Sequence, residues 1–246
     1  MAIITVLGVA AAIAMAVIGS GALGGTAVAE AAGGALSADA TPLAPAGTAF
    51  SIWSVIYAGL AAYALWQLTP TARASERQRV LRPWAILSAF LNAGWLFTVQ
   101  FDALWLSVIV IVALLAVLIR TGGVIELTLT DGTFGLYFGW VLVATFANTW
   151  ATLSAAGVTA LEEIPLGVVG IVVAGVVAAV AALLDGGRIA PALATSWGLA
   201  WIAVARTGGR FDSDTLVWTA AAAAAVVLLV AVARRATVAR TNQPAA

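Results

Sequence analysis

The chain has 246 residues, of which 63% are hydrophobic and 9% are charged, with a mean hydropathy of +1.08 and a net charge of zero. Soluble domains carry roughly 25% charged residues, so this composition indicates an integral membrane protein. Zero net charge argues against a nucleic acid partner. Cysteine, histidine and lysine are absent, which excludes disulfides, thiolate metal sites, histidine ligation of haem and Schiff-base chemistry.

Eight apolar stretches are long enough, or nearly so, to cross a bilayer, since a helical crossing needs about 20 apolar residues. Strands are disfavoured because the polar and apolar residues do not alternate with period two. The sequence therefore predicts an all-α membrane protein. The expected spans are residues 3–24, 48–69, 84–101, 104–120, 134–155, 166–184, 190–206 and 215–233.

The first stretch is followed by AVAE at residues 27–30, which is similar to a signal-peptidase site. No basic segment precedes the apolar run, and the run is long for a secretion signal. We therefore expect it to be retained as the first membrane helix.

The arginines predict the orientation of the chain. With the N-terminus inside and eight spans, only Arg206 and Arg210 fall on the outer side. Basic residues accumulate in cytoplasmic loops, so we expect a multi-pass protein of the cell membrane with both termini in the cytoplasm. The arginines on the inner side are Arg73, Arg77, Arg79, Arg82, Arg120, Arg188, Arg234, Arg235 and Arg240.

Two short stripes of aromatic and polar residues lie in the second and third spans. Phe50, Trp53 and Tyr57 follow at i, i+3 and i+7, on one face of a helix. Asn92 and Trp95 lie at i and i+3, and an amide in the apolar core should face the bundle, where it can be paired. The spacing leaves open whether these residues specify packing or line a pocket.

A longer stripe lies in the fifth span, where Tyr137, Trp140, Ala144 and Asn148 follow one another at steps of three or four residues. Thr145 lies beside them and could bond to its own helix backbone. Large rings around a small residue leave a concavity that a flat ligand could occupy. Ala144 could equally admit a neighbouring helix.

No catalytic grouping is visible in the sequence. The carboxylates lie in loops or at the ends of spans, as Asp102 and Asp185 do, where solvated caps are the simplest interpretation. Without histidine, cysteine or lysine, an ordinary acid–base hydrolase is not expected. A non-enzymatic role without a metal site is favoured, and enzymatic activity is left open.

At these positions the first five spans resemble the TspO/MBR family, the translocator proteins or tryptophan-rich sensory proteins. The resemblance covers residues 1–156, and the rest of the chain is a C-terminal extension. Three places carry it: Pro45 followed by Trp53 and Tyr57, the pair Asn92-x-x-Trp95, and the pattern Y-x-x-W-x-x-x-A-T-x-x-N from Tyr137 to Asn148.

The resemblance implies a five-helix bundle over residues 1–156 with a ligand cavity, followed by a three-helix extension over residues 157–246 with a short cytoplasmic tail. It implies a receptor or carrier for a flat hydrophobic ligand, tetrapyrrole-like, in a sensory or transport role. A porphyrin-like ligand would be held without histidine ligation. The positions carried over as ligand-binding are Trp53, Tyr57, Asn92, Trp95, Tyr137, Trp140, Ala144, Thr145 and Asn148.

The chain also departs from that family. The segment SADATPLAPAGT before the second span has no aromatic residue, and no aromatic-plus-basic sterol motif follows Asn148. The partners expected are therefore the bilayer and a small hydrophobic ligand, but not a sterol. The three extra helices could cover a face used for dimer contacts, which is compatible with a monomer. The alternative function is a structural or assembly subunit of a larger membrane complex.

Overall fold

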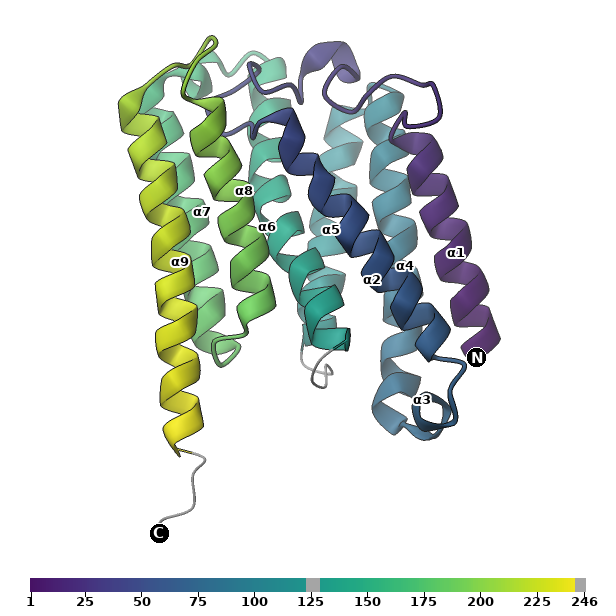
Figure 1. Cartoon of the computed structure of the whole chain (residues 1–246). Helices are drawn as coiled ribbons and strands as arrows, with labels where there is room; N and C mark the ends of the chain where they lie inside the picture. Colours follow the sequence, from purple (N-terminus) through teal and green to yellow (C-terminus); the bar gives the residue numbers. More distant parts are fainter. Residues whose placement is uncertain (123–128, 242–246) are drawn as a thin grey trace.

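The computed structural model describes residues 1–122 and 129–241, and no residue in these ranges lies in a strand. Long helices run side by side through the molecule (Figure 1). They are α1 (Ala2–Gly19), α2 (Ile52–Trp66), α4 (Glu76–Gln100), α5 (Leu104–Gly122), α6 (Leu129–Ala155), α7 (Ile164–Leu184), α8 (Ile189–Ala205) and α9 (Asp214–Thr241). The short helices are η1 (Ala32–Gly34), η2 (Gly47–Ser51), α3 (Pro70–Ala74) and η3 (Thr159–Glu162).

Within the described ranges, seven helical segments are long and apolar enough to cross a membrane, counting η2 and α2 as one segment from Gly47 to Trp66. The remaining apolar helix, α8, has 17 residues, which corresponds to about 26 Å at 1.5 Å per residue. The predicted all-α membrane fold is confirmed. Exposed valines and leucines cover the outer faces of α7 and α9, as contact with lipid tails requires.

The sequence places the arginine-rich segment 70–83 outside the predicted spans, and in the structure this segment is largely helical. Thr69 caps α3, where its hydroxyl accepts from the Ala72 amide, and Ser75 caps α4 in the same way. The third span therefore begins at Glu76, eight residues before the predicted start. Arg82 is buried in this region, and its Nε donates to Gln67 Oε1 at 2.8 Å.

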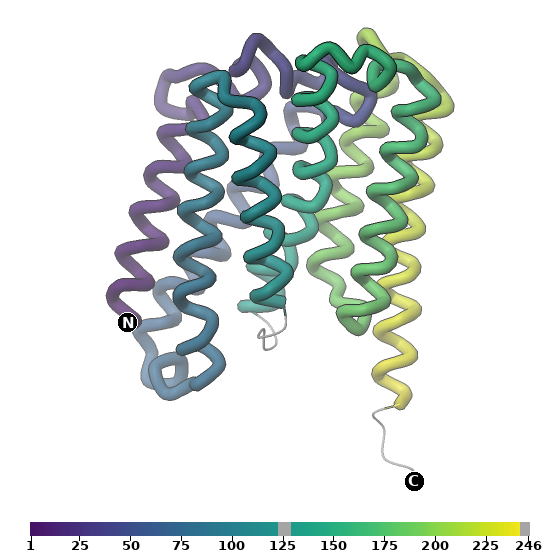
Figure 2. Tube along the Cα trace, turned by 180° about the vertical axis from the view of Figure 1, so that it is seen from behind, coloured from purple at the N-terminus to yellow at the C-terminus, as the bar shows by residue number. Residues whose placement is uncertain are grey.

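The start of α1 and the end of α9 lie at the same end of the bundle, together with α3 and the turn between α7 and α8 (Figure 1). An even number of crossings requires this arrangement. The buried apolar residues form two clusters, one shared by α1, α2, α4, α5 and α6, and one shared by α6 to α9. Helix α6 contributes to both clusters and lies between the two groups of helices (Figure 2).

Helices α6 and α8 approach each other closely because glycines face the contact. A Cβ placed on Gly139 would lie 2.2 Å from the carbonyl oxygen of Pro191, and one on Gly135 would lie 2.8 Å from the Pro191 ring. On α8, a Cβ placed on Gly198 would lie 2.9 Å from the side chain of Val143. Small residues at such contacts allow membrane helices to pack backbone to backbone.

The segment between η1 and η2, residues 35–46, is called the roof here, and Arg206 at the end of α8 anchors it. Arg206 is fully buried, and its guanidinium donates to the carbonyl oxygens of Thr41 at 3.1 Å, Ala44 at 3.4 Å and Ala38. Burial lowers the pKa of Arg206, and the carboxylate of Asp39 opposes this. The arginine predicted to mark the outer side thus holds the chain segment that precedes the second span.

A second, more exposed set of contacts reinforces this anchor. The Arg210 amide donates to Asp39 Oδ1 at 3.1 Å, and its guanidinium pairs with Glu162. A hydrogen bond from the Ser154 hydroxyl and another from Arg210 hold the pKa of Glu162 below its ordinary value. The loop after α8 is therefore tied both to the roof and to η3.

Replacing Arg206 by methionine is expected to destabilise the fold by about 2 kcal/mol, because buried roof carbonyls lose a charged donor. Thermal unfolding in detergent measures this loss. The matched control is Arg210→Met, whose ion pair is 56% exposed on the arginine side and should contribute no more than about 1 kcal/mol. Equal shifts for the two variants would contradict the anchoring role of Arg206.

Candidate functional site

A cluster of five aromatic rings fills the space between η2, α2 and α6. Trp53 stacks on Tyr57 with ring centroids 5.5 Å apart, and its edge-to-face partners are Tyr137 at 5.8 Å and Trp140 at 6.3 Å. Phe50 meets Trp140 edge to face at 5.6 Å. The second-span and fifth-span stripes therefore face each other across one contact, as aromatic pairs prefer.

The third span supports this cluster through hydrogen bonds. Asn92 is buried, and its Nδ2 donates to Tyr57 Oη at 2.9 Å. The hydroxyl of Tyr137 donates to the backbone carbonyl of Ser88 at 2.9 Å. Both tyrosines are thus fixed from α4, and the predicted inward orientation of Asn92 agrees with the structure.

A second polar group lies where α4, α5 and α6 meet. Trp95 Nε1 donates to Asn148 Oδ1 at 3.3 Å, and Asn148 Nδ2 donates to Ser107 Oγ at 2.9 Å. The Ser107 hydroxyl in turn donates a hydrogen bond to the Leu104 carbonyl of its own helix at 2.7 Å. The three side chains are buried, so each polar atom that is paired here avoids the penalty of burial without a partner.

A narrow cavity of about 30 Å³ adjoins this polar group, and Trp95 and Asn148 line it. That volume is enough for about one water molecule. The roof closes the cavity from one side through Leu36, Ala44 and Pro45, and α4 and α6 form the other walls. The wall residues of these two helices are Trp95, Trp140, Val143, Ala144, Ala147, Asn148 and Ala151.

A larger pocket of about 460 Å³ lies on the other side of Phe50, between α1, α2 and the segment that follows α1. Phe50 lines both spaces. Ligand sites for small molecules usually have volumes of about 300–1,000 Å³, so this outer pocket has the size of such a site. The residues around it are Val17, Ser20, Ala22, Ala27, Val28, Ala29, Gly47, Phe50, Trp53, Ser54, Tyr57 and Leu96.

Three buried polar atoms near these spaces have no hydrogen-bond partner among the described residues: Trp53 Nε1, Trp140 Nε1 and Asn92 Oδ1. Two are donors and one is an acceptor. Buried polar atoms are normally paired, so these atoms are available to a bound molecule or to water. They lie within the aromatic cluster or next to it.

The structure brings most of the predicted binding residues together around Phe50. Trp95, Trp140, Ala144 and Asn148 line the narrow cavity, and Trp53 and Tyr57 line the outer pocket. Asn92 and Tyr137 stand behind these walls as supports. Thr145 is different: its hydroxyl donates to the Val141 carbonyl at 2.7 Å, and it lines neither space.

Sequence reasoning missed two contributors to the site. Ser107 has the signal of a lone hydroxyl in an apolar span, but nothing local pairs it with Asn148, which lies 41 positions away. The roof residues Leu36 and Ala44 carry no motif at all. Their position follows from Arg206, whose role depends on contacts with residues more than 160 positions away.

No group of three histidine, cysteine, aspartate or glutamate side chains in the described part of the chain is placed to hold a metal ion. The residues that line the two spaces include no aspartate, glutamate or arginine. Aromatic faces and uncharged hydrogen-bonding groups form the walls, and such walls suit an apolar, flat molecule.

The fold and the buried aromatic site define a multi-pass helical membrane protein with cavities between its helices. A model of the TSPO-like protein family matches residues 2–233. The chain therefore belongs to the TSPO-like protein family, as the motifs of the first five spans suggested. The match extends beyond residues 1–156 into α9. Comparison with curated proteins and with solved structures finds no match.

The bond between Ser107 and Asn148 should contribute to stability. Ser107→Ala is expected to lower the free energy of unfolding by about 1–2 kcal/mol, because the buried amide of Asn148 loses its acceptor. Thermal or denaturant unfolding in detergent measures the effect. When Asn148→Leu is combined with Ser107→Ala, the double variant should lose less unfolding free energy than the sum of the losses in the two single variants. Strict additivity would show that the pair is not coupled.

Proposed function

We propose that this protein is a membrane receptor or carrier that binds a flat hydrophobic ligand, tetrapyrrole-like in shape, in a sensory or transport role. The observation that carries the proposal is the 460 Å³ outer pocket with Trp53 and Tyr57 on its wall. A pocket of this size, with stacked aromatic faces and few polar atoms, is suited to a planar apolar molecule.

A hydrogen-bonding group at the pocket supports specific recognition of a ligand rather than nonspecific partitioning of apolar molecules into the pocket. Trp53 lines the pocket, and its Nε1 is buried without a described partner, so a ligand with an acceptor could pair with it. An unpaired group in a low-dielectric interior is unfavourable, and pairing on binding would favour the ligand that matches. Without histidine in the chain, a metal at the centre of such a ligand would not gain an imidazole ligand.

Binding rather than chemistry is what the wall residues support. An acid or base catalyst must lie within hydrogen-bond reach of the reacting group, and the two spaces are lined by aromatic, small and amide side chains. The exposed apolar residues of α7 and α9 are accounted for by contact with lipid. These residues therefore do not in themselves favour the alternative function, a structural or assembly subunit of a larger membrane complex.

Filling the outer pocket should weaken binding. Ser54 lines the pocket and is exposed on the protein surface, so Ser54→Phe can occupy the pocket without overpacking a core. We expect its dissociation constant for protoporphyrin IX, measured by quenching of tryptophan fluorescence, to rise about tenfold or more, which corresponds to about 1.4 kcal/mol.

The control is Ala62→Phe, an equally large change at an exposed position on the same helix that lines neither the outer pocket nor the narrow cavity. It should bind the porphyrin like the unmodified protein. Unchanged binding in Ser54→Phe, or equal weakening in both variants, would reject the outer pocket as the site.

We further propose that the protein lies in the cell membrane with both termini in the cytoplasm. The positive-inside rule and the position of the start of α1 and the end of α9 on one side of the bundle (Figure 1) support this orientation. That side carries α3 and the first turn of α4, with Arg73, Arg77 and Arg79.

The absence of native cysteine makes the orientation testable with single cysteines. Ala156→Cys, at the exposed end of α6, should react with an impermeant maleimide in intact cells. Ala74→Cys, exposed at the end of α3, should react only after the membrane is opened. The reverse pattern of labelling would invert the proposed topology.

A further inference from the structure

A third space lies on the opposite side of α6 from the narrow cavity, in the groove where α5 and α7 flank α6. Its volume is about 600 Å³, the largest of the spaces described here. Phe138 and Leu142 of α6 form its floor, whereas Trp140 and Ala144 of the same helix line the narrow cavity. The groove is thus separate from the aromatic site.

The groove opens to the surface of the helix bundle that faces the lipid tails. Ile119 of α5 is 62% exposed and Leu184 of α7 is 83% exposed, and both line it. Water is unfavourable on such walls inside a bilayer, and an empty groove would forfeit packing contacts. A hydrocarbon chain is therefore the natural occupant. The apolar walls include Leu115, Leu118, Val177 and Val180.

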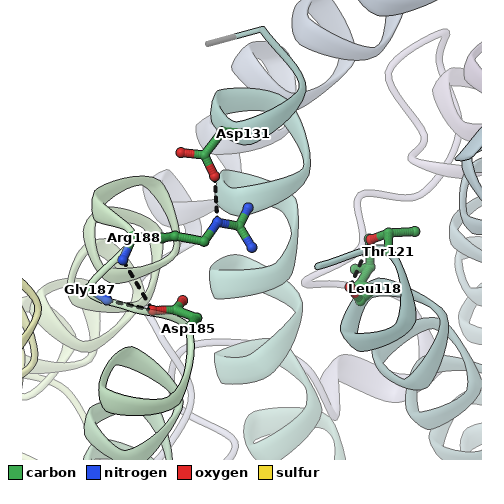
Figure 3. A network of polar contacts seen from close by, with 6 residues as sticks. All are labelled: Leu118, Thr121, Asp131, Asp185, Gly187 and Arg188. Atoms are coloured by element: carbon green, nitrogen blue, oxygen red, sulfur yellow. Dashed lines mark hydrogen bonds and ion pairs between the residues drawn. The ribbon is translucent and has the colours of Figure 1, made fainter. Parts of the chain in front are cut away.

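One end of the groove is polar, and Figure 3 shows its charged residues. Arg188, just before α8, extends toward α6, and its Nε pairs with Asp131. Its Nη1 lies near the end of α5, 3.5 Å from where a Cβ on Gly122 would be. The buried Nη2 has no acceptor among the residues that the structure describes. Within the described part of the chain, Nη2 is therefore a donor without an acceptor at the end of an apolar groove.

Asp185 lies at the same end and lines the groove. Its Oδ1 accepts from the backbone amides of Gly187 at 3.0 Å and Arg188 at 3.1 Å (Figure 3). Burial raises the pKa of this carboxyl above its ordinary value, since the charged form loses solvation. Among the residues that line the groove, Asp185 and Arg188 thus place one carboxylate and one guanidinium at this end.

We propose that the groove binds a membrane phospholipid whose headgroup carries both a phosphate and a primary ammonium group. One acyl chain occupies the apolar groove, the phosphate accepts from Arg188 Nη2, and the ammonium group pairs with Asp185. This headgroup complements both the guanidinium of Arg188 and the carboxylate of Asp185, whereas a purely anionic headgroup would bring a further negative charge to Asp185. The proposal is independent of the ligand proposed for the aromatic pocket.

The test is native mass spectrometry of the purified full chain after delipidation and incubation with equal amounts of dioleoyl phosphatidylethanolamine, phosphatidylglycerol and phosphatidylcholine. We expect one tightly retained phosphatidylethanolamine, preferred about tenfold over the other two lipids. Arg188→Gln should remove this preference, and Arg240→Gln, exposed in the last turn of α9, should keep it.

A second pair of variants tests the groove itself, and it does not disturb the ion pair of Arg188. Val177 lines the groove and is 40% exposed, so Val177→Trp should fill the groove and abolish tight retention. Val176 is 56% exposed on the same helix and does not line it, so Val176→Trp should retain the lipid. Equal retention of the three lipids, a preference for phosphatidylglycerol, or unchanged retention in Val177→Trp would each overturn the proposal.

Discussion

The close packing of α8 against α6 is the contact on which the rest of the architecture depends. Lipid tails are as apolar as the helices, so association in a bilayer rests on packing and hydrogen bonds rather than on the hydrophobic effect. At Gly135 and Gly139 any side chain would collide with Ala190 or Pro191. Only the bare backbone of α6 lets α8 come near enough for the two apolar clusters to share one central helix.

The position of α8 in turn determines the position of the roof. Besides Arg206, the Ala46 amide at the end of the roof donates to the Trp201 carbonyl at 3.1 Å. Next to the roof, Trp197 Nε1 donates to the carbonyl of Ala49 in η2 at 3.0 Å. Helix α8 and the arginine at its end thus hold both the roof and η2. Since the roof closes one side of the narrow cavity, α8 contributes to the site without lining that cavity itself.

The sequence was informative where a single helix determines the outcome. Apolar length located the spans, and helical spacing placed Trp53 and Tyr57 on one face and Trp140 and Asn148 on another. It could also predict that Asn92 faces inward, because a lone amide in lipid must find a partner. It could not name that partner, since the hydroxyl of Tyr57 is brought near only by the packing of α2 against the bundle.

The burial of two arginines could not be predicted from the local sequence. The sequence predicts that Arg82 and Arg206 mark the topology at the membrane surface, whereas both are buried in the structure. Each donates to backbone carbonyls or to an amide of a distant segment, so a long side chain with several donors replaces water at a chain turn. No local pattern separates these arginines from exposed ones such as Arg79, which pairs with Glu76 on the surface.

The arrangement of the two spaces around Phe50 restricts where a ligand can be held. The cavity beside Asn148 has room for about one water molecule, whereas the outer pocket has the volume of a ligand site, and the Phe50 ring lies on the wall of both. A ligand in the outer pocket can therefore reach Trp140 Nε1 and Asn148 only if that ring moves. Phe50 belongs to the 3₁₀ turn η2 rather than to the regular part of α2, and 3₁₀ hydrogen bonds have poorer geometry than α-helical ones. The residue that separates the two spaces thus lies in the least regular part of its span, next to the roof that α8 holds.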